Sequence, residues 1–215
     1  MNLINRLRFL FLTRFNRPRR YRVLFEMIYQ HRYHRLVEIG VLHGVHARQM
    51  IQTATLHHSP NAIHYFGFDL FEDLSEALLQ SELSKKASPY TRVQQRLEKT
   101  GAHIQLFKGN TKETLPQALP IIGQADFVFI DGGHSLDTIQ SDWSYVKELM
   151  NSQTHVIFDD YYVDTTPALE GLGCQTLIDQ LDRQQYEVHV FDQTDVFRKE
   201  WGVLKIKMAV VKKKR

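Results

Sequence analysis

Short apolar runs alternate along this chain with segments of helical period, and this alternation restricts its fold more than any other feature. The runs that we predict to be buried strands are Val37–Ile39 (within the stretch Leu36–Gly40), Tyr65–Leu70, His103–Lys108, Phe127–Ile130, Val156–Phe158, Tyr186–Phe191 and Val203–Val211. Helices are predicted over Gly44–Thr55, most of Asp73–Thr100, Thr111–Leu119, Leu136–Met150 and Leu169–Leu181. Strands separated by helix-length segments are typical of βαβ units, so the pattern predicts an α/β fold with a mostly parallel sheet.

The last two apolar runs depart from this pattern. A short polar connection without a clear helix joins Tyr186–Phe191 to Val203–Val211, which predicts a closing antiparallel hairpin. The length of 215 residues, with 43% hydrophobic and 24% charged residues, fits one globular domain with short extensions. We therefore predict a basic helical extension at residues 1–34, the α/β domain at 35–211 and a basic tail at 212–215.

Positive charge is concentrated at the two ends of the chain. Residues 1–36 hold nine arginines and a single acid, Glu26, and the last four residues are Lys212, Lys213, Lys214 and Arg215. Basic ends of this kind bind nucleic acid, anionic lipid or an acidic partner, or simply keep a protein in solution. We expect no nucleic-acid partner, and we leave open a weak contact between the N-terminus and a membrane surface.

Targeting and redox signals are weak in this sequence. The apolar stretch Phe9–Leu12 is too short for the core of a signal peptide, and no stretch approaches the ~20 apolar residues that span a membrane. An Arg-rich, acid-poor start is also compatible with an organelle transit peptide. The single cysteine, Cys174, excludes an internal disulfide and a cysteine-based zinc cluster. Together these features favour a cytoplasmic location.

Polar residues follow nearly every predicted parallel strand. They are Glu38-Ile39-Gly40, Asp69, Gly109-Asn110, Asp131-Gly132-Gly133-His134 and Asp159-Asp160. In a doubly wound sheet, ligands bind beyond the carboxyl ends of the strands, near the point where the strand order reverses. These residues are therefore the candidates for a binding site.

The first of these motifs combines an acid with two glycines four residues apart. Gly40 permits a tight turn and close approach of a ligand, and Gly44 opens the next helix. Leu42 occupies the middle position of what would otherwise be a dinucleotide fingerprint, which disfavours a pyrophosphate ligand. Glu38 suits a cationic ligand instead, such as the ammonium group of an amino-acid moiety. The alternative is a strand–helix turn with purely structural glycines.

Two further strand ends suggest contacts to a nucleoside. Asp69 is well placed to accept hydrogen bonds from both hydroxyls of a ribose, and Leu70 could flank an adenine. Asn110 can both donate to and accept from an adenine edge. Each has a structural alternative, because Asp69 could cap a helix and Thr111 could cap the helix that follows Asn110.

The strongest motif places three carboxylates at the ends of two neighbouring strands. Asp131 follows Phe127–Ile130, and Asp159 and Asp160 follow Val156–Phe158. Three anions this close together need a cation between them, or protons. Aspartate oxygens favour a hard divalent cation such as Mg²⁺. The alternative is that some of the three cap helices and face water. His134, three residues after Asp131, is a candidate general base.

With these motifs, the chain resembles the class I S-adenosylmethionine-dependent methyltransferases over roughly residues 35–211. Within that class it is similar to a branch of small metal-dependent O-methyltransferases, which includes macrocin-type sugar O-methyltransferases and, more distantly, catechol O-methyltransferase. The most specific segments are Phe129-Ile130-Asp131-Gly132-Gly133-His134 and Phe158-Asp159-Asp160-Tyr161.

This resemblance implies a Rossmann-like fold with a seven-stranded sheet in the order 3-2-1-4-5-7-6. It implies S-adenosylmethionine as the methyl donor, bound by Glu38, Gly40, Gly44, Asp69, Leu70, Asn110 and Asp131. It assigns the divalent metal to Asp131, Asp159 and Asp160, and the proton-accepting role to His134. The expected acceptor is a hydroxyl on a sugar or phenol-like small molecule. Leu42, His46 and residues 1–34 depart from the relatives, which leaves the acceptor open.

Three alternatives remain on the sequence alone. A metal-independent O- or N-methyltransferase would use the aspartates to orient its substrate. A non-catalytic nucleotide-binding or membrane-surface accessory protein would depend on the basic ends. An NAD-dependent oxidoreductase is disfavoured by Leu42 in the glycine motif.

Overall fold

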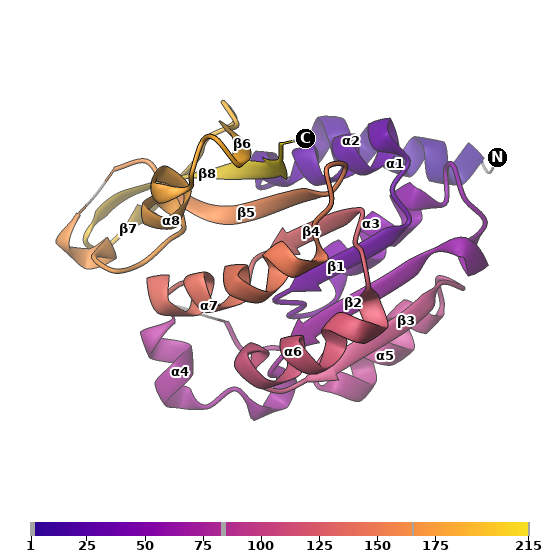
Figure 1. The fold of residues 1–215 in the computed structure, drawn as a ribbon, viewed down its shortest axis with the longest axis horizontal. Helices are drawn as coiled ribbons and strands as arrows, with labels where there is room; N and C mark the ends of the chain where they lie inside the picture. The colour runs from indigo at the N-terminus through magenta and orange to yellow at the C-terminus, as the bar shows by residue number, and fades with distance from the viewer. Residues whose placement is uncertain (1–2, 83–84, 165, 215) are drawn as a thin grey trace.

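A single twisted sheet runs through the middle of the molecule, and helices cover both of its faces (Figure 1). This computed structural model describes residues 3–82, 85–164 and 166–214. The strand order is β3-β2-β1-β4-β5-β8-β6, with β7 paired to β8. The strands are β1 (Arg35–Ile39), β2 (His64–Asp69), β3 (His103–Lys108), β4 (Phe127–Ile130), β5 (His155–Tyr162), β6 (Tyr186–Val190), β7 (Asp195–Lys199) and β8 (Gly202–Lys213).

The predicted sheet order is confirmed, with one additional strand. β1 to β5 pair in parallel, and β8 lies antiparallel between β5 and β6. The strand missed in the sequence is β7, which pairs with the first half of β8. Its alternation is only partly apolar and its residues are mostly exposed, so the connection before β8 reads as a polar loop.

Two helical layers sandwich the sheet. On one face lie α1 (Leu3–Phe15), α2 (Arg22–His31), α3 (Val45–Ala54) and α5 (Tyr90–Glu98), whose apolar residues share one core cluster. On the other face lie α6 (Thr111–Ile122), α7 (Leu136–Val146) and α8 (Gln175–Gln180), with a second cluster. The short helix α4 (Glu76–Ser81) and the 3₁₀ turns η1 (Arg19–Tyr21), η2 (Pro60–Ala62), η3 (Phe71–Asp73), η4 (Lys147–Leu149) and η5 (Pro167–Leu169) complete the described elements.

Several predicted helix boundaries were wrong. The segment Asp73–Thr100 contains two separate helices, α4 and α5, and α5 begins only after Pro89; residues 83–84 of this segment lie outside the described residues. The predicted helix Leu169–Leu181 is reduced to α8, because Gly171 and Gly173 adopt positive φ values before it. In contrast, α6 runs past Pro116 to Ile122. Helical periodicity alone did not show these interruptions.

β5 is longer than its apolar core predicts, and this matters for the site. Asp159 and Asp160 lie inside the strand and not after it. The register with β8 shifts between Phe158 and Tyr161, and Asp160 has a φ of 57°. A bulge of this kind re-aims side chains at the edge of a site.

The N-terminal extension is helical, as predicted, but part of it belongs to the core. Leu24, Phe25 and Ile28 of α2 are fully buried against the sheet. Only one side of α1 is covered, mainly through Leu12 and Phe9. Residues 1–2 and Arg215 of the predicted basic ends lie outside the described residues. None of the helices in the described ranges is long and apolar enough to cross a bilayer.

Candidate active site

The carboxyl ends of β1, β4 and β5 meet at one edge of the sheet, where the sequence predicted a site. Gly40 has a φ of 92°, and a Cβ at this position would lie 1.9 Å from the carbonyl oxygen of Asp131. Any side chain here would therefore force β1 and β4 apart. Gly44 has a φ of 67° and precedes α3 as its N-cap. The two glycines hold a tight turn between β1 and α3.

Glu38 lies deeper than a direct ligand contact requires. Its side chain is buried, and the hydroxyl of Tyr65 donates a hydrogen bond to its carboxyl group. Burial, with the nearby charge of Asp69, raises the pKa of Glu38 to about 8. A bound ammonium group would oppose this rise, because a neighbouring positive charge lowers the pKa of a carboxyl group. The predicted contact of Glu38 with a cationic ligand stays a prediction.

Asp69 organises the turn that follows β1. Its Oδ2 accepts the backbone N–H of Leu42 at 2.7 Å, and its Oδ1 accepts that of Phe71 at 2.6 Å. Both Leu42 and Phe71 have a φ of 52°, a left-handed conformation that costs a non-glycine residue about 1–2 kcal/mol. Asp69 thus offsets the strain of two loops at the cofactor edge. Leu70, which directly precedes Phe71 in the chain, is half-buried.

Asn110 is the N-cap of α6, a role that the sequence analysis had offered to Thr111 instead. Its side-chain oxygen accepts the backbone N–H of Lys112 at 2.9 Å. Its predicted contact with an adenine edge is therefore limited to groups that the cap does not use. Asp69 and Asn110 both lie at the carboxyl ends of neighbouring parallel strands, β2 and β3.

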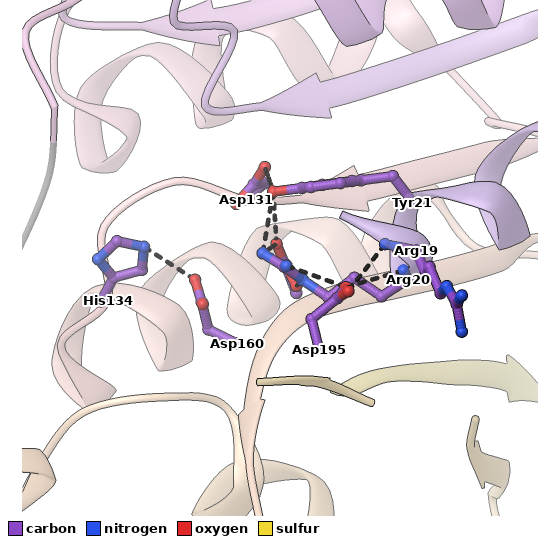
Figure 2. Close-up of polar contacts among 8 residues, drawn as sticks. Arg19, Arg20, Tyr21, Asp131, His134, Asp160 and Asp195 are labelled. Carbon is purple, nitrogen blue, oxygen red and sulfur yellow. Dashed lines mark hydrogen bonds and ion pairs between the residues drawn. The ribbon is translucent and has the colours of Figure 1, made fainter. Parts of the chain in front are cut away.

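An arginine from the N-terminal extension enters the aspartate cluster (Figure 2). Arg20 binds Asp159 through two parallel hydrogen bonds, Nε to Oδ1 at 2.6 Å and Nη2 to Oδ2 at 2.8 Å. The Arg20 side chain is 7% exposed and that of Asp159 is 1% exposed. Burial opposes the charge of the guanidinium, but Asp159 more than compensates, so the pKa of Arg20 rises. The sequence analysis expected a cation or protons among the three aspartates. For Asp159, that cation is an arginine of the same chain, Arg20.

Asp195 of β7 binds the backbone of that arginine and of the residue before it. Its Oδ1 accepts the N–H of Arg19 at 2.8 Å, and its Oδ2 accepts the N–H of Arg20 at 2.9 Å. Tyr21 extends the network, because its hydroxyl donates to Asp159 at 2.9 Å and lies 3.4 Å from Asp131. The N-terminal extension therefore forms one wall of the cluster (Figure 2).

His134 and Asp160 form the other side of the cluster. The Nε2 atom of His134 lies 2.8 Å from Asp160 Oδ2, and its Nδ1 atom bonds the backbone carbonyl of Glu82. A carbonyl only accepts, and so does an ionised carboxylate, so both ring nitrogens carry protons here. Burial alone would lower the pKa of His134, but Asp160 raises it to about 9. In this arrangement His134 is a cation, and a general-base role requires the ring to leave one of these partners.

The surroundings of Asp131 and Asp160 shift the pKa values of these two carboxyl groups in opposite directions. Burial, followed by the charges of Asp159 and Asp160, raises the pKa of Asp131 well above its ordinary value. Burial opposes ionisation of Asp160 too, but His134 outweighs it and lowers the pKa of Asp160. Two carboxylates, Asp159 and Asp160, therefore face the cationic side chains Arg20 and His134, while burial and the neighbouring carboxylates raise the pKa of Asp131.

A divalent cation fits only part of the predicted ligand set. One ligand atom from each of Asp131, His134 and Asp160 lies within 4.8 Å of the others. A cavity of about 10 Å³ between the strand ends, large enough for one water molecule or ion, is lined by Asp131, Asp160 and Asp159 among others. Both oxygens of Asp159 are already bound by Arg20. The group whose ligand atoms lie close together therefore contains His134 where the sequence analysis expected Asp159, and the predicted metal site itself stays a prediction.

Comparison with known proteins identifies the family. A family model described as a methyltransferase domain matches residues 37–161, which is more than half of the chain and includes the glycine turn and all three aspartates. This chain belongs to that family. The prediction of a methyltransferase enzyme with a class I Rossmann-like fold is therefore confirmed. No curated protein sequence matches the chain.

Solved structures with the same fold include several methyltransferases at low sequence identity. Cofactor-bound Rv0187 from MTB has a TM-score of 0.62 at 14% identity, over 98% of this chain and 90% of its own. An O-methyltransferase from Bacillus cereus in complex with SAH has a TM-score of 0.60 at 14% identity, over 99% and 92%. The O-methyltransferase TomG from Streptomyces achromogenes, in complex with SAM, has a TM-score of 0.59 at 13% identity, over 99% and 91%. At these identities the likeness shows the fold alone.

Sequence reasoning missed four residues that shape the site of this methyltransferase. They are Arg20, Tyr21, Glu82 and Asp195. Glu82 receives hydrogen bonds from the backbone N–H and the hydroxyl of Ser135, so it ties the chain after α4 to the loop that carries His134. The one available signal was the excess of negative charge at the strand ends, which required a cation without naming it.

Proposed function

We propose that this enzyme transfers a methyl group from S-adenosylmethionine to a hydroxyl group of a small molecule, such as a sugar or a phenol. The observation that carries this proposal is the cluster of Asp131, His134 and Asp160 beside the glycine turn after β1. The family supplies methyl transfer, and this cluster supplies groups that bind a hydroxyl and move its proton. Two of the solved structures with this fold are O-methyltransferases with SAM or SAH, which supports the same donor.

The carboxyl ends of β1, β2 and β3 fit the methyl donor. The turn from Gly40 to Gly44 is the proposed contact of the methionine end, and Asp69 has the chemistry to accept the ribose hydroxyls. To do so, Asp69 must share its oxygens with the two backbone N–H groups it already binds. Leu70 and Asn110 are the proposed neighbours of the adenine.

Asp131, His134 and Asp160 are the proposed holders of a divalent cation. When bound, such a cation lowers the pKa of a hydroxyl group that contacts it. Two carboxylates and an imidazole suit Mg²⁺ less well than all-oxygen ligands do, and they suit Mn²⁺ or Zn²⁺ better. Arg20 keeps Asp159 out of this set and neutralises it instead.

When His134 binds no cation, it is the proposed acceptor of the hydroxyl proton, with Asp160 as its partner. For this, Nε2 must first lose its proton and turn away from Asp160, which frees one carboxylate oxygen. Glu82 holds the opposite nitrogen, so the ring can only swing about that contact. Tyr21 contributes a hydroxyl donor next to Asp131, and its own pKa is raised by burial and by Asp131, so it orients and does not accept a proton.

Arg20 favours a second candidate, a metal-independent methyltransferase. The Arg20 guanidinium already binds Asp159 and the His134 imidazolium already faces Asp160, so two of the three carboxylates have a cationic partner without a metal. In this version the aspartates and Tyr21 orient the acceptor hydroxyl, and catalysis comes from alignment with the methyl group.

Calorimetric titration of S-adenosylhomocysteine into the protein tests the donor. We expect binding with and without EDTA, lost in Asp69→Ala and kept in Asp137→Ala, whose exposed carboxylate only pairs with Lys112 on the surface. Absence of binding to folded wild-type protein would overturn the proposed donor.

A titration with Mn²⁺ distinguishes the two versions of the site. The metal-dependent version predicts Mn²⁺ binding that is lost in Asp160→Asn and kept in Asp179→Asn on α8. It also predicts that methylation of a panel of glycosides and phenols stops in EDTA. Activity that EDTA leaves intact, without Mn²⁺ binding, would establish the metal-independent version.

A further inference from the structure

The outward side of α1 is apolar, and no described element packs on it. Its exposed residues are Leu3, Ile4, Leu7, Leu10, Phe11 and Phe15, with exposed fractions between 48% and 69%. In the described part of the chain, these are six of the fourteen large apolar side chains that are exposed, on one helix of 13 residues. An apolar surface of this size on one element marks an interaction site.

The opposite, inward side of α1 packs on the rest of the molecule. Leu12 is buried, and Phe9 stacks on Tyr29 of α2 with ring centroids 4.4 Å apart. The inward and outward sides of α1 are therefore different surfaces, one packed on the core and one presented to the surroundings. In Figure 1, α1 and α2 lie along one edge of the molecule, away from α6 and α7.

Every charged residue of α1 is an arginine. At 100° per residue, the six exposed apolar residues span an arc of roughly 140°, and Arg6 and Arg8 lie just outside its two borders. Arg14 lies within the arc, and its long side chain can reach past the apolar residues to a polar surface. An apolar stripe bordered by arginine, without an acid, is typical of a helix that lies in the interface of an anionic bilayer.

The helical layer that contains α1 carries the same charge. α1, α2, α3 and α5 together hold seven arginines and two acids, whereas α6, α7 and α8 hold one lysine and four acids. Between α3 and α5 a hollow of about 350 Å³ is lined by Arg48, Arg92, Arg96 and Lys99. Within the described residues, none of these four side chains forms an ion pair.

We infer that α1 docks this protein onto an anionic lipid surface, with its apolar side in the headgroup region and its arginines on lipid phosphates. Charge decides between this occupant and a second copy of the chain. A twofold pairing of α1 with itself would bring the arginines of both copies together. RNA would satisfy the arginines but would leave the apolar stripe in water.

Vesicle flotation with the full chain tests this inference. We expect the protein to float with vesicles of phosphatidylcholine containing about 30% phosphatidylglycerol, and not with phosphatidylcholine alone. Raising the salt from about 0.1 M to about 0.5 M should weaken binding. Equal flotation on neutral vesicles, or none on anionic vesicles, would overturn the inference.

Surface variants separate the apolar and the basic contributions. Phe11→Asp should reduce partitioning about tenfold or more, and Arg8→Gln with Arg14→Gln should reduce it about fivefold for each arginine lost. The matched controls are Ile121→Asp and Lys147→Gln, which alter exposed residues on the opposite helical layer and should leave flotation unchanged. Unchanged thermal unfolding and cofactor binding in all variants would show that the fold is intact.

Site-specific labelling shows whether α1 itself enters the interface. Cys174 is fully buried, so a Phe11→Cys variant can be labelled selectively with an environment-sensitive fluorophore. Its emission should shift to the blue on anionic vesicles, and that of Ile121→Cys should not. A dimer in sedimentation velocity that Phe11→Asp dissociates, or RNA binding without vesicle binding, would assign the surface to another occupant and overturn the inference.

Discussion

Replacing Arg20 with methionine tests the most unexpected contact of the structure. The substitution keeps the apolar stem and removes the guanidinium that binds Asp159 through two hydrogen bonds. Both side chains are almost fully buried, so little solvent screens the charge that remains. Asp159 would then be a buried carboxylate beside Asp160, with the Tyr21 hydroxyl as its remaining donor.

The magnitude follows from the burial of the pair. Removing one partner of a buried ion pair costs about 3–5 kcal/mol, because the other charge stays buried without compensation. Asp159→Asn in the same background removes that charge, so the double variant should recover part of the loss, with a coupling energy of about 1–3 kcal/mol. Arg19→Met is the matched control, because the Arg19 side chain points away from the carboxylates (Figure 2) and should change stability by less than about 0.5 kcal/mol.

The pH dependence of the stability of Arg20→Met is a second, independent test of the ion pair. Without Arg20, the pKa of Asp159 in the folded protein lies further above its unfolded value, since burial and Asp160 both raise it. The folded state then binds the proton more tightly, so stability falls as pH rises between the two pKa values. The loss caused by Arg20→Met should therefore be larger at about pH 8 than at about pH 5.

Urea unfolding of the four variants at both pH values measures these energies. A loss of stability below about 1 kcal/mol for Arg20→Met, with no coupling to Asp159→Asn, would refute the reasoning. A carboxylate that stays buried without its partner destabilises the fold by more than this. An unchanged slope of free energy against urea would show that the variants unfold by the same transition.

Three further predictions concern Gly40, Asp69 and Glu38, with Gly123→Ala as the control for the first. Gly40→Ala should destabilise the fold by more than about 3 kcal/mol, because its Cβ would lie 1.9 Å from the carbonyl oxygen of Asp131. Gly123→Ala has nothing within 4 Å and should cost only its backbone strain of about 1–3 kcal/mol, since Gly123 has a φ of 64° and a ψ of −123°; thermal unfolding compares the two. Asp69→Asn should lower unfolding free energy by about 2 kcal/mol through weaker bonds to two backbone N–H groups, measured in urea. Glu38 has a folded pKa of about 8, above its unfolded value, so wild-type stability should fall through that pH, and Glu38→Gln should remove the fall in urea midpoints between about pH 6 and about pH 9.

The sheet was predictable because its strands are bounded sharply in the sequence. Each parallel strand is a short apolar run followed by a glycine or an acid, and βαβ handedness leaves few ways to order such runs. The same logic placed Asp131 and Asp160 at one edge, where the structure has them. It failed for β7, whose exposed residues carry no core pattern, and for the length of β5, since two acids read as the end of a strand.

The contacts of the cluster were beyond prediction for a different reason. Arg20 lies 139 residues from Asp159 and is one of nine arginines in a basic segment. Composition describes these arginines as a group, and nothing local distinguishes the one that is buried. The state of His134 was equally hidden, because it depends on the carbonyl of Glu82, which an unpredicted loop brings to the ring.

Burial divides the basic N-terminal segment into two parts with separate consequences. Arg20 has two carboxylate partners and almost no solvent contact, so its charge acts on the fold and on the aspartate cluster. Arg8 and Arg14 are exposed on α1 beside the apolar stripe, so their charge acts on whatever lies outside the molecule. If both assignments hold, Arg20→Met lowers stability without changing vesicle flotation, and Arg8→Gln with Arg14→Gln does the reverse. Arginines that look alike in the sequence, Arg20 on one side and Arg8 and Arg14 on the other, would then be separable by two assays, which is the strongest reason to measure both on the same set of variants.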